Sequence, residues 1–197
     1  HKMSDNYIHF DEIDDVLASV RLLAQLVPKL PTDPWAWKWV IIAAHNALQG
    51  ALVCALSGPA GVGALEKQSA GAVLDWFEKR TGNPPKKRLA DFNTLVARGC
   101  NAERMSYLGA IPLCLDSQQR KDLRRLNDEF RNNFMHFTPK GWSIERIGLP
   151  RIILTAVGAI GHLMSQPQVI YKLDDTQRHD MEDNLAMIAR ALQQSEL

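Results

Sequence analysis

The sequence is poor in the residues that build disulfide-bonded or metal-clustered proteins. Among 197 residues it has 3 cysteines, Cys54, Cys100 and Cys114, an odd number at wide spacing without a CxxC pair. This pattern excludes a disulfide framework and is typical of a reducing compartment. The His, Asp and Glu residues show no spacing typical of a metal site. We therefore expect a cytoplasmic protein that uses neither a metal nor another cofactor.

The chain also lacks a large net charge, with 23 Lys and Arg against 22 Asp and Glu. The balance hides an asymmetry, because residues 79–151 hold 15 Lys or Arg and only 7 Asp or Glu, and the rest of the chain is acidic. Two interpretations are open. Either the basic middle forms a face that attracts a polyanion, or the basic and acidic parts pair with each other across the fold.

No stretch alternates polar and apolar residues for long enough to predict a strand, and no internal repeat is present. The composition, 46% hydrophobic and 23% charged, is ordinary for a globular chain. Apolar residues recur at helical spacing along most of the sequence. We expect one all-α domain over residues 4–197, a bundle of six to seven helices. Residues 1–3 are interpreted as the remnant of a tag before the natural start at Met3.

The periodicity predicts helices over 11–27, 35–56, about 65–80, 89–107, 116 or 117 to 137, 150–165 and 174–194. The segment 35–56 is long and apolar enough to be mistaken for a membrane span. Polar side chains interrupt it at Lys38, His45, Asn46 and Gln49. We therefore expect a central core helix there and no membrane segment.

The helix predicted over 116–137 carries the most informative pattern. At about 100° per residue, an apolar stripe that would face the core comprises Leu123, Leu126, Phe130, Phe134 and Phe137. The opposite side holds Arg125, Glu129, Asn132 and His136. Asn132 and His136 adjoin each other at i, i+4, and Arg131 lies on the flank. The periodicity predicts that His136 lies outside the core.

Residues 131–136, Arg-Asn-Asn-Phe-Met-His, form an Arg-polar-x3-His pattern late on this helix. The pattern resembles the signature of the HEPN superfamily of all-α proteins. In HEPN ribonucleases, two protomers pair so that their signatures face each other and form one composite site, which cleaves RNA without a metal. The resemblance implies a homodimer that acts on RNA and leaves a 2′,3′-cyclic phosphate and a 5′-hydroxyl. It is compatible with a toxin that has a cognate antitoxin or regulatory partner, with phage defence and with RNA processing.

The residue types suit that chemistry, because the 2′-hydroxyl of RNA is its own nucleophile. Cleavage needs a group that moves protons near neutral pH, and His136 is the candidate. Arg131 would stabilise the charge that builds on the phosphorane, and Asn132 would orient the phosphate or the ring. Arg125 is a candidate substrate contact. One imidazole does not easily serve as both base and acid, and a second protomer would supply another.

Two alternatives stay open for these residues. Arg131 could pair with Asp128 or Glu129 on a solvated face, with His136 merely near a helix C-terminus, where a cation is favoured. Members of the superfamily that bind RNA or a partner without cutting are also common, so a non-catalytic helical module that binds RNA or a protein is the alternative function.

A second group of candidates, Lys38, His45 and Gln49, shares one face of the helix predicted over 35–56. A polar stripe on a buried helix must find hydrogen-bond partners. The functional interpretation is a substrate-facing wall near His136. The structural one, which we favour, is a satisfied hydrogen-bond network between helices.

Overall fold

The computed structural model describes residues 7–136, 138–139 and 141–194, and in these residues the protein is all-α. The α-helices are α1 (Glu12–Leu26), α2 (Ala36–Leu56), α3 (Lys67–Lys79), α4 (Phe92–Gly99), α5 (Ala102–Tyr107), α6 (Ser117–Arg124), α7 (Asn132–Met135), α8 (Leu149–Met164), α9 (Pro167–Ile170) and α10 (Asp175–Gln194). A 3-10 turn, η1 (Val27–Lys29), follows α1, and a π-helix, η2 (Arg125–Arg131), joins α6 to α7. The described residues form no strand, and one isolated bridge joins Leu65 to Leu89. The predicted all-α class is confirmed.

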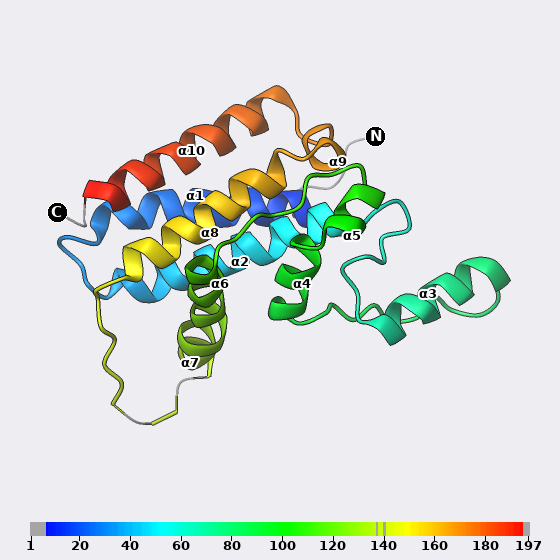
Figure 1. The fold of residues 1–197 in the computed structure, drawn as a ribbon, viewed down its shortest axis with the longest axis horizontal. Helices are drawn as coiled ribbons and strands as arrows, with labels where there is room; N and C mark the ends of the chain where they lie inside the picture. The colour runs from blue at the N-terminus through cyan, green and yellow to red at the C-terminus, as the bar shows by residue number, and fades with distance from the viewer. Residues whose placement is uncertain (1–6, 137, 140, 195–197) are drawn as a thin grey trace.

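The central helix of the bundle is α2. Figure 1 shows α1, α2, α8 and α10 as long rods packed together, and α2 contacts α1, α8 and α4. By length and composition α2 could cross a membrane, but 67% of its most apolar window is buried inside the fold. The predicted core helix is therefore confirmed for this segment.

The contact between α1 and α2 depends on the capping of α1 and on close packing. The Asp11 side chain accepts hydrogen bonds from the N–H groups of Ile13 and Asp14, which fixes the start of α1. The two helices approach so closely at Gly50 that a Cβ there would lie 2.7 Å from Cγ2 of Val16. A glycine is required at this point because no side chain fits between the helices.

Two features of the chain differ from the helices that periodicity predicts. The prediction of one helix over 89–107 is wrong, because the structure divides it into α4 and α5. The Asn101 side chain accepts a hydrogen bond from the Arg104 N–H at 2.8 Å, so Asn101 begins a new helix. The short helix α9, with Pro167 in its first turn, was not predicted. With α6, η2 and α7 counted as one helical unit, the described residues contain nine helices rather than six to seven.

Two parts of the chain project from the bundle. Figure 1 shows α3 extending to one side and the α6–η2–α7 unit leaving the bundle at a steep angle. The return segment after α3 is tied to it, because Trp76 Nε1 donates to Gly82 O at 3.1 Å and Arg88 N donates to Ser69 Oγ at 2.9 Å. The α6–η2–α7 unit carries the candidate motif. Residues 1–3, interpreted as a tag remnant, and Phe137 lie outside the described residues.

Two helical glycines give a matched test of the α1–α2 packing. Gly158 is exposed in α8, with nothing within 4 Å of an added Cβ. Gly158→Ala is expected to raise the free energy of unfolding by about 0.5–1 kcal/mol through helix propensity. Gly50→Ala gains the same propensity but forces its Cβ against Val16, so we expect a net loss of about 1–3 kcal/mol. Urea unfolding followed by circular dichroism measures both, and equal effects of the two substitutions would contradict the close approach.

Candidate functional site

The helical unit that carries the motif is firmly anchored at its start. Asp116 and Gln119 form a capping box, in which each side chain accepts a hydrogen bond from the other residue's backbone N–H, at 2.8 and 3.0 Å. Leu123, Leu126 and Phe130 are buried, as the apolar stripe predicts. This side of the unit therefore packs on the bundle.

The end of the unit is held by aromatic contacts. Phe134 is half-buried and meets Trp142 edge-on, with ring centroids 4.8 Å apart. The Trp142 ring also lies 6.4 Å from that of Phe130. The loop after the motif is thus packed back onto the helix that carries it.

A regular α-helix was expected here, but the seven residues of η2 form a π-helix. The N–H of Asn132 donates to the carbonyl of Asn127, five residues earlier. Wide turns of this kind are rare and often occur at functional sites. Because η2 ends at Arg131, the candidate motif begins where the wide turn closes.

His45 of α2 lies against this wide turn. The side chain is 3% exposed, and its ring stacks on Phe92 of α4 with centroids 4.4 Å apart and an interplanar angle of 26°. Its Nε2 lies 2.9 Å from Oδ1 of Asn127. An amide oxygen accepts only, so Nε2 carries the proton and donates. The structure therefore brings His45 into a hydrogen-bonded contact between α2 and η2.

Burial lowers the pKa of His45 from 6.5 to about 4. The hydrogen bond to Asn127 acts in the opposite direction, and the positive charge of Arg131 lowers the pKa further. The imidazole is therefore neutral at pH 7, and the guanidinium of Arg131 lies close enough to lower its pKa.

The hydrogen bonds continue beyond His45. The Asn127 side chain donates to Asp128 Oδ1 at 2.6 Å, and Asp128 also accepts from Asn93 Nδ2 of α4 at 3.0 Å. The sequence interpretation missed Asn127 and Asn93, and it named Asp128 only as an alternative ion-pair partner of Arg131. A signal existed for Asn127, because it lies at i, i+4 from Arg131 and adjoins it on a helix.

Arg131 is half-buried, and its Nη1 donates to Oδ1 of Asn132 at 3.0 Å. The alternative interpretation placed it in an ion pair with Asp128 or Glu129. Within the described residues, neither carboxylate pairs with Arg131. Asp128 accepts from amide groups instead, and Glu129 pairs with Arg125. Arg131 therefore presents a guanidinium whose plane is oriented by the adjacent amide.

His136 ends α7 and is exposed. Its backbone N–H donates to the carbonyl of Asn132 at 3.0 Å, and Asn132 itself is half-buried. The imidazole thus lies outside the core, where the periodicity places it. Among the described residues no hydrogen bond joins its ring to Arg131, so the site of a single chain is open.

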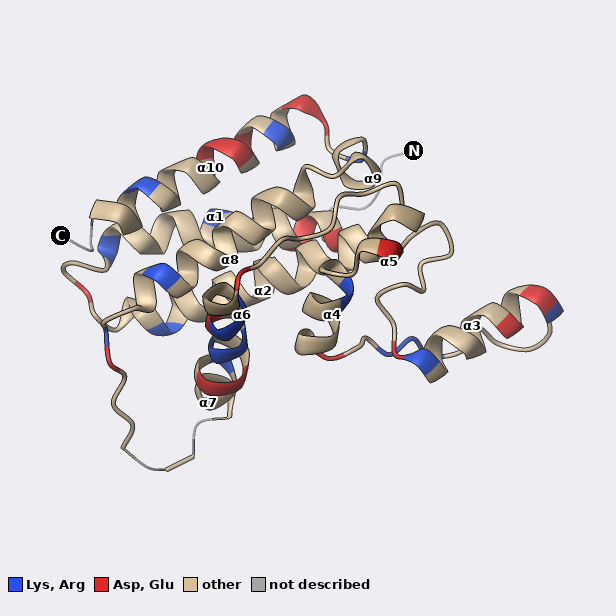
Figure 2. Ribbon diagram, in the orientation of Figure 1, with Lys and Arg blue, Asp and Glu red and all other residues tan. Residues whose placement is uncertain are grey.

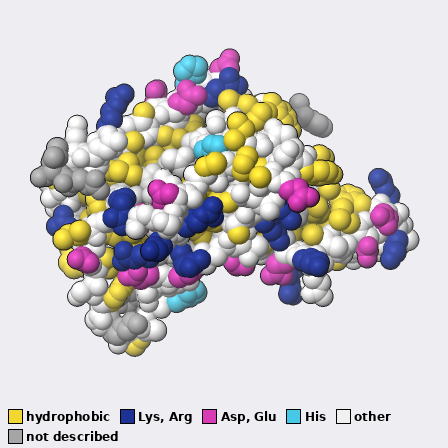
Figure 3. All heavy atoms as spheres, viewed as in Figure 1, with side chains coloured by type: hydrophobic (Ala, Val, Ile, Leu, Met, Phe, Trp, Pro, Cys, Tyr) yellow, Lys and Arg dark blue, Asp and Glu magenta, His cyan; other side chains and the backbone are white. Residues whose placement is uncertain are grey.

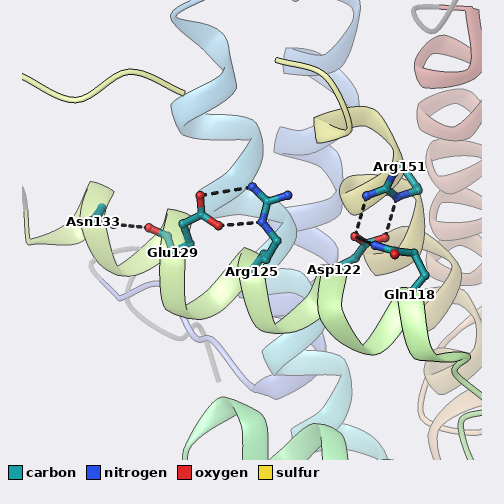
Figure 4. A network of polar contacts seen from close by, with 6 residues as sticks. All are labelled: Gln118, Asp122, Arg125, Glu129, Asn133 and Arg151. Atoms are coloured by element: carbon teal, nitrogen blue, oxygen red, sulfur yellow. Dashed lines mark hydrogen bonds and ion pairs between the residues drawn. The ribbon is translucent and has the colours of Figure 1, made fainter. Parts of the chain in front are cut away.

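Arg125, a candidate substrate contact, is engaged within its own helix. Figure 4 shows its guanidinium in a bidentate ion pair with Glu129. Nε donates to Oε2 at 2.7 Å, and Nη2 donates to Oε1 at 3.3 Å. The guanidinium also lies 5.1 Å from the centroid of Phe130. The hydrogen bonds with Glu129 raise the pKa of Arg125. A substrate would have to displace this pair to use Arg125.

The same face holds a second ion pair nearer the bundle. Asp122 is fully buried and accepts two hydrogen bonds of 3.0 Å from Arg151 of α8, and Gln118 also donates to it at 3.0 Å. Figure 4 shows this pair beside that of Arg125 and Glu129. A buried carboxylate must be paired, so Arg151 fixes α6 against α8.

The other candidates on α2 do not join one cluster with His45. The ammonium of Lys38 lies 4.9 Å from the ring centroid of Trp39. Gln49 is half-buried one turn after His45. Asn46 donates to Ser19 Oγ of α1 at 3.0 Å. The polar face of α2 is therefore divided between contacts with different neighbours.

The described residues contain no group of three or more His, Cys, Asp or Glu side chains that could hold a metal ion. What they offer is an oriented guanidinium, an amide and an exposed imidazole within six residues of one helix end. Such groups bind an anionic oxygen and transfer protons. No known family, curated protein or solved structure matches the chain.

The buried imidazole of His45 predicts a loss of stability in acid. Its pKa is about 4 in the folded chain and 6.5 in the unfolded one, so the unfolded chain binds more protons between these values. The contribution of the neutral His45 ring to the free energy of unfolding is complete above pH 6.5 and is lost as the pH falls towards 4. We expect a loss of about 3 kcal/mol from this group, since each pKa unit corresponds to about 1.4 kcal/mol.

His45→Gln is the matched control, because its amide donates a hydrogen bond but does not titrate. Urea unfolding at pH 7, 6, 5 and 4 should show that the free energy of unfolding falls less steeply with decreasing pH in the variant than in the wild type. Parallel curves would show that His45 is not the titrating group.

Proposed function

We propose that this protein is a metal-independent endoribonuclease whose composite site forms when two copies pair at the motif-bearing helix. One observation carries the proposal: the helix end presents Arg131, Asn132 and His136 outside the core, and the neighbouring carboxylates are committed to other partners. The HEPN-like order of these residues gives them a common chemical role.

In the proposed reaction the 2′-oxygen of the RNA attacks the adjacent phosphorus. The O2′–P bond forms and the P–O5′ bond breaks, which yields a 2′,3′-cyclic phosphate and a 5′-hydroxyl. An imidazole of His136 removes the 2′ proton, and another protonates the leaving 5′-oxygen. Arg131 stabilises the charge on the phosphorane, and Asn132 holds the guanidinium in the required plane through its 3.0 Å hydrogen bond.

Two imidazoles are needed because one group does not easily act as base and acid in the same step. A second copy of the chain supplies the other. Met135, which precedes His136, is 52% exposed. In the proposed dimer this side chain would lie at the surface where the two copies meet.

A second candidate function is RNA binding without cleavage, favoured by the charge of α6. Lys121 and Arg124 are exposed there, and Figure 2 shows blue Lys and Arg segments on α6. In the space-filling view of the same face, Lys and Arg side chains gather over this helix (Figure 3). The ion pairs among the described residues join groups within the basic middle or within the acidic remainder, and none crosses between them. A basic face for a polyanion is therefore the better-supported interpretation of the charge asymmetry.

The nuclease proposal predicts cleavage that survives EDTA and depends on the motif. His136→Ala and Arg131→Ala should each reduce the cleavage rate at least about 100-fold, the usual scale of general acid–base and charge-stabilising groups. End-group analysis should find a 2′,3′-cyclic phosphate and a 5′-hydroxyl. Sedimentation should show a dimer at the concentrations used.

His179→Ala is the control, because His179 is a histidine of α10, outside the motif-bearing helix. Circular dichroism checks that each variant is folded. Cleavage that persists in both motif variants would eliminate this site. Binding without any cleavage by the wild type would favour the second candidate.

The basic face is tested by the salt dependence of binding to single-stranded RNA in the His136→Ala background. Replacing Lys121 and Arg124 by Gln should lower the slope of log K against log salt by about 1.4, because each phosphate contact to a single strand contributes about 0.7. The control replaces Lys67 and Lys79 of α3 by Gln, for which we expect no change. Equal slopes in both variants would exclude α6 as the phosphate contact.

A further inference from the structure

Two of the three cysteines lie in stretches of backbone that adjoin each other. Cys100 is the C-cap of α4, and Cys114 lies in the non-helical segment 110–116 that leads into α6 (Figure 1). The N–H of Leu113 donates to the carbonyl of Gly99 at 2.8 Å. Each cysteine follows directly after one partner of this hydrogen bond, so the fold brings their backbones together at this point.

Arg120 of α6 joins the same two stretches on the other side of Cys114. Its Nε donates to the carbonyl of Leu115 at 3.2 Å, and its guanidinium also hydrogen-bonds to the thiol of Cys100. The Cys114 thiol is itself close enough to Cys100 to act on it electrostatically. A disulfide requires Cα atoms within about 7 Å of each other. Contacts on both sides of Cys114 favour such an approach.

The three cysteines are free thiols in unequal environments. Cys114 is exposed and accessible to a solute, whereas Cys100 is half-buried. Burial raises the pKa of Cys100, and the guanidinium of Arg120 acts in the opposite direction by favouring the thiolate. Burial raises the pKa of Cys54 to about 12, so this third thiol is shielded and stays protonated. The pair therefore combines an accessible sulfur with a shielded one beside a cation.

We propose that Cys100 and Cys114 form a modification site at which a peroxide converts the two thiols into a disulfide. The Cys114 thiolate attacks hydrogen peroxide, so that an S–O bond forms, the O–O bond breaks and hydroxide leaves. The Cys100 thiolate then attacks the sulfenic sulfur of Cys114, which forms the S–S bond and releases a second hydroxide. The two protons of the thiols convert both hydroxides to water.

In a reducing compartment such a disulfide is transient, because cellular thiols reduce it. The site is independent of the proposed ribonuclease activity, since neither cysteine belongs to the α6–η2–α7 unit, and its test involves no RNA.

Mass spectrometry of the full chain tests which sulfurs pair. Trypsin cleaves at Arg104 between the two cysteines and yields peptides 99–104 and 105–120, with one cysteine in each. After treatment with hydrogen peroxide and blocking of the remaining thiols with N-ethylmaleimide, these two peptides should appear linked and should separate on reduction. Cys54→Ser is the control and should leave the linked pair unchanged.

The single variants distinguish the attacking sulfur from the resolving one. In Cys100→Ser, Cys114 should remain a sulfenic acid that dimedone labels, and no linked pair should form. In Cys114→Ser, both the dimedone label and the linked pair should be lost. A dimedone label on Cys100 in the second variant would contradict the assigned order.

Equilibration with reduced and oxidised glutathione tests whether the fold, and not the short sequence separation, brings the thiols together. A short flexible linker alone gives an effective concentration in the millimolar range, which the same chain unfolded in concentrated urea should show. We expect the native chain to exceed that value at least about 10-fold. The proposal is overturned if peroxide produces no linked pair, if Cys54 replaces either partner, or if the native effective concentration is no higher than that in urea.

Discussion

An uncharged imidazole buried between helices holds the candidate site in place. His45 comes from the central helix α2, stacks on Phe92 of α4 and hydrogen-bonds to Asn127 of η2. Burying an ionised side chain costs several kcal/mol, so this junction is compatible only with the neutral ring. Asn127 lies one turn before Arg131 in the same helical unit, so the contact with His45 ties the start of the motif to α2. His45 of α2 thus supports the helical unit that carries the candidate motif.

The sequence predicted those helices whose ends are marked by local chemistry and whose faces are strongly periodic. α1 begins at a capping aspartate and α2 follows a proline-rich turn, so their bounds agree with the prediction within a residue or two. The division of 89–107 was missed because its apolar pattern continues through the break. Asn101 caps the start of the next helix by accepting a backbone hydrogen bond, an effect that periodicity does not detect.

At the site, helical periodicity predicted which of these side chains are buried, but it did not predict which residues they contact. It placed Leu126 and Phe130 in the core and His136 outside it, since a helix that buries one stripe exposes the other. It did not predict the π-helix, because an apolar stripe does not distinguish i→i+5 from i→i+4 hydrogen bonds. Because the sequence did not predict the wide turn, it also did not predict the hydrogen bond from His45 to Asn127. A shared face on α2 indicated that His45 needed a partner but not which helix would supply it.

The wide turn of η2 also means that the orientation of the motif is set by the number of residues as well as by their identity. Its i→i+5 hydrogen bonds take up about one residue more than a regular α-helix uses for the same rotation. If the same seven residues closed as a regular α-helix, every residue after them would turn by about 100° around the helix axis. Arg131, Asn132 and His136 would keep their order and their spacing and yet point in another direction. Two proteins with the same six motif residues therefore share a site geometry only if the helical turn before the motif is also the same.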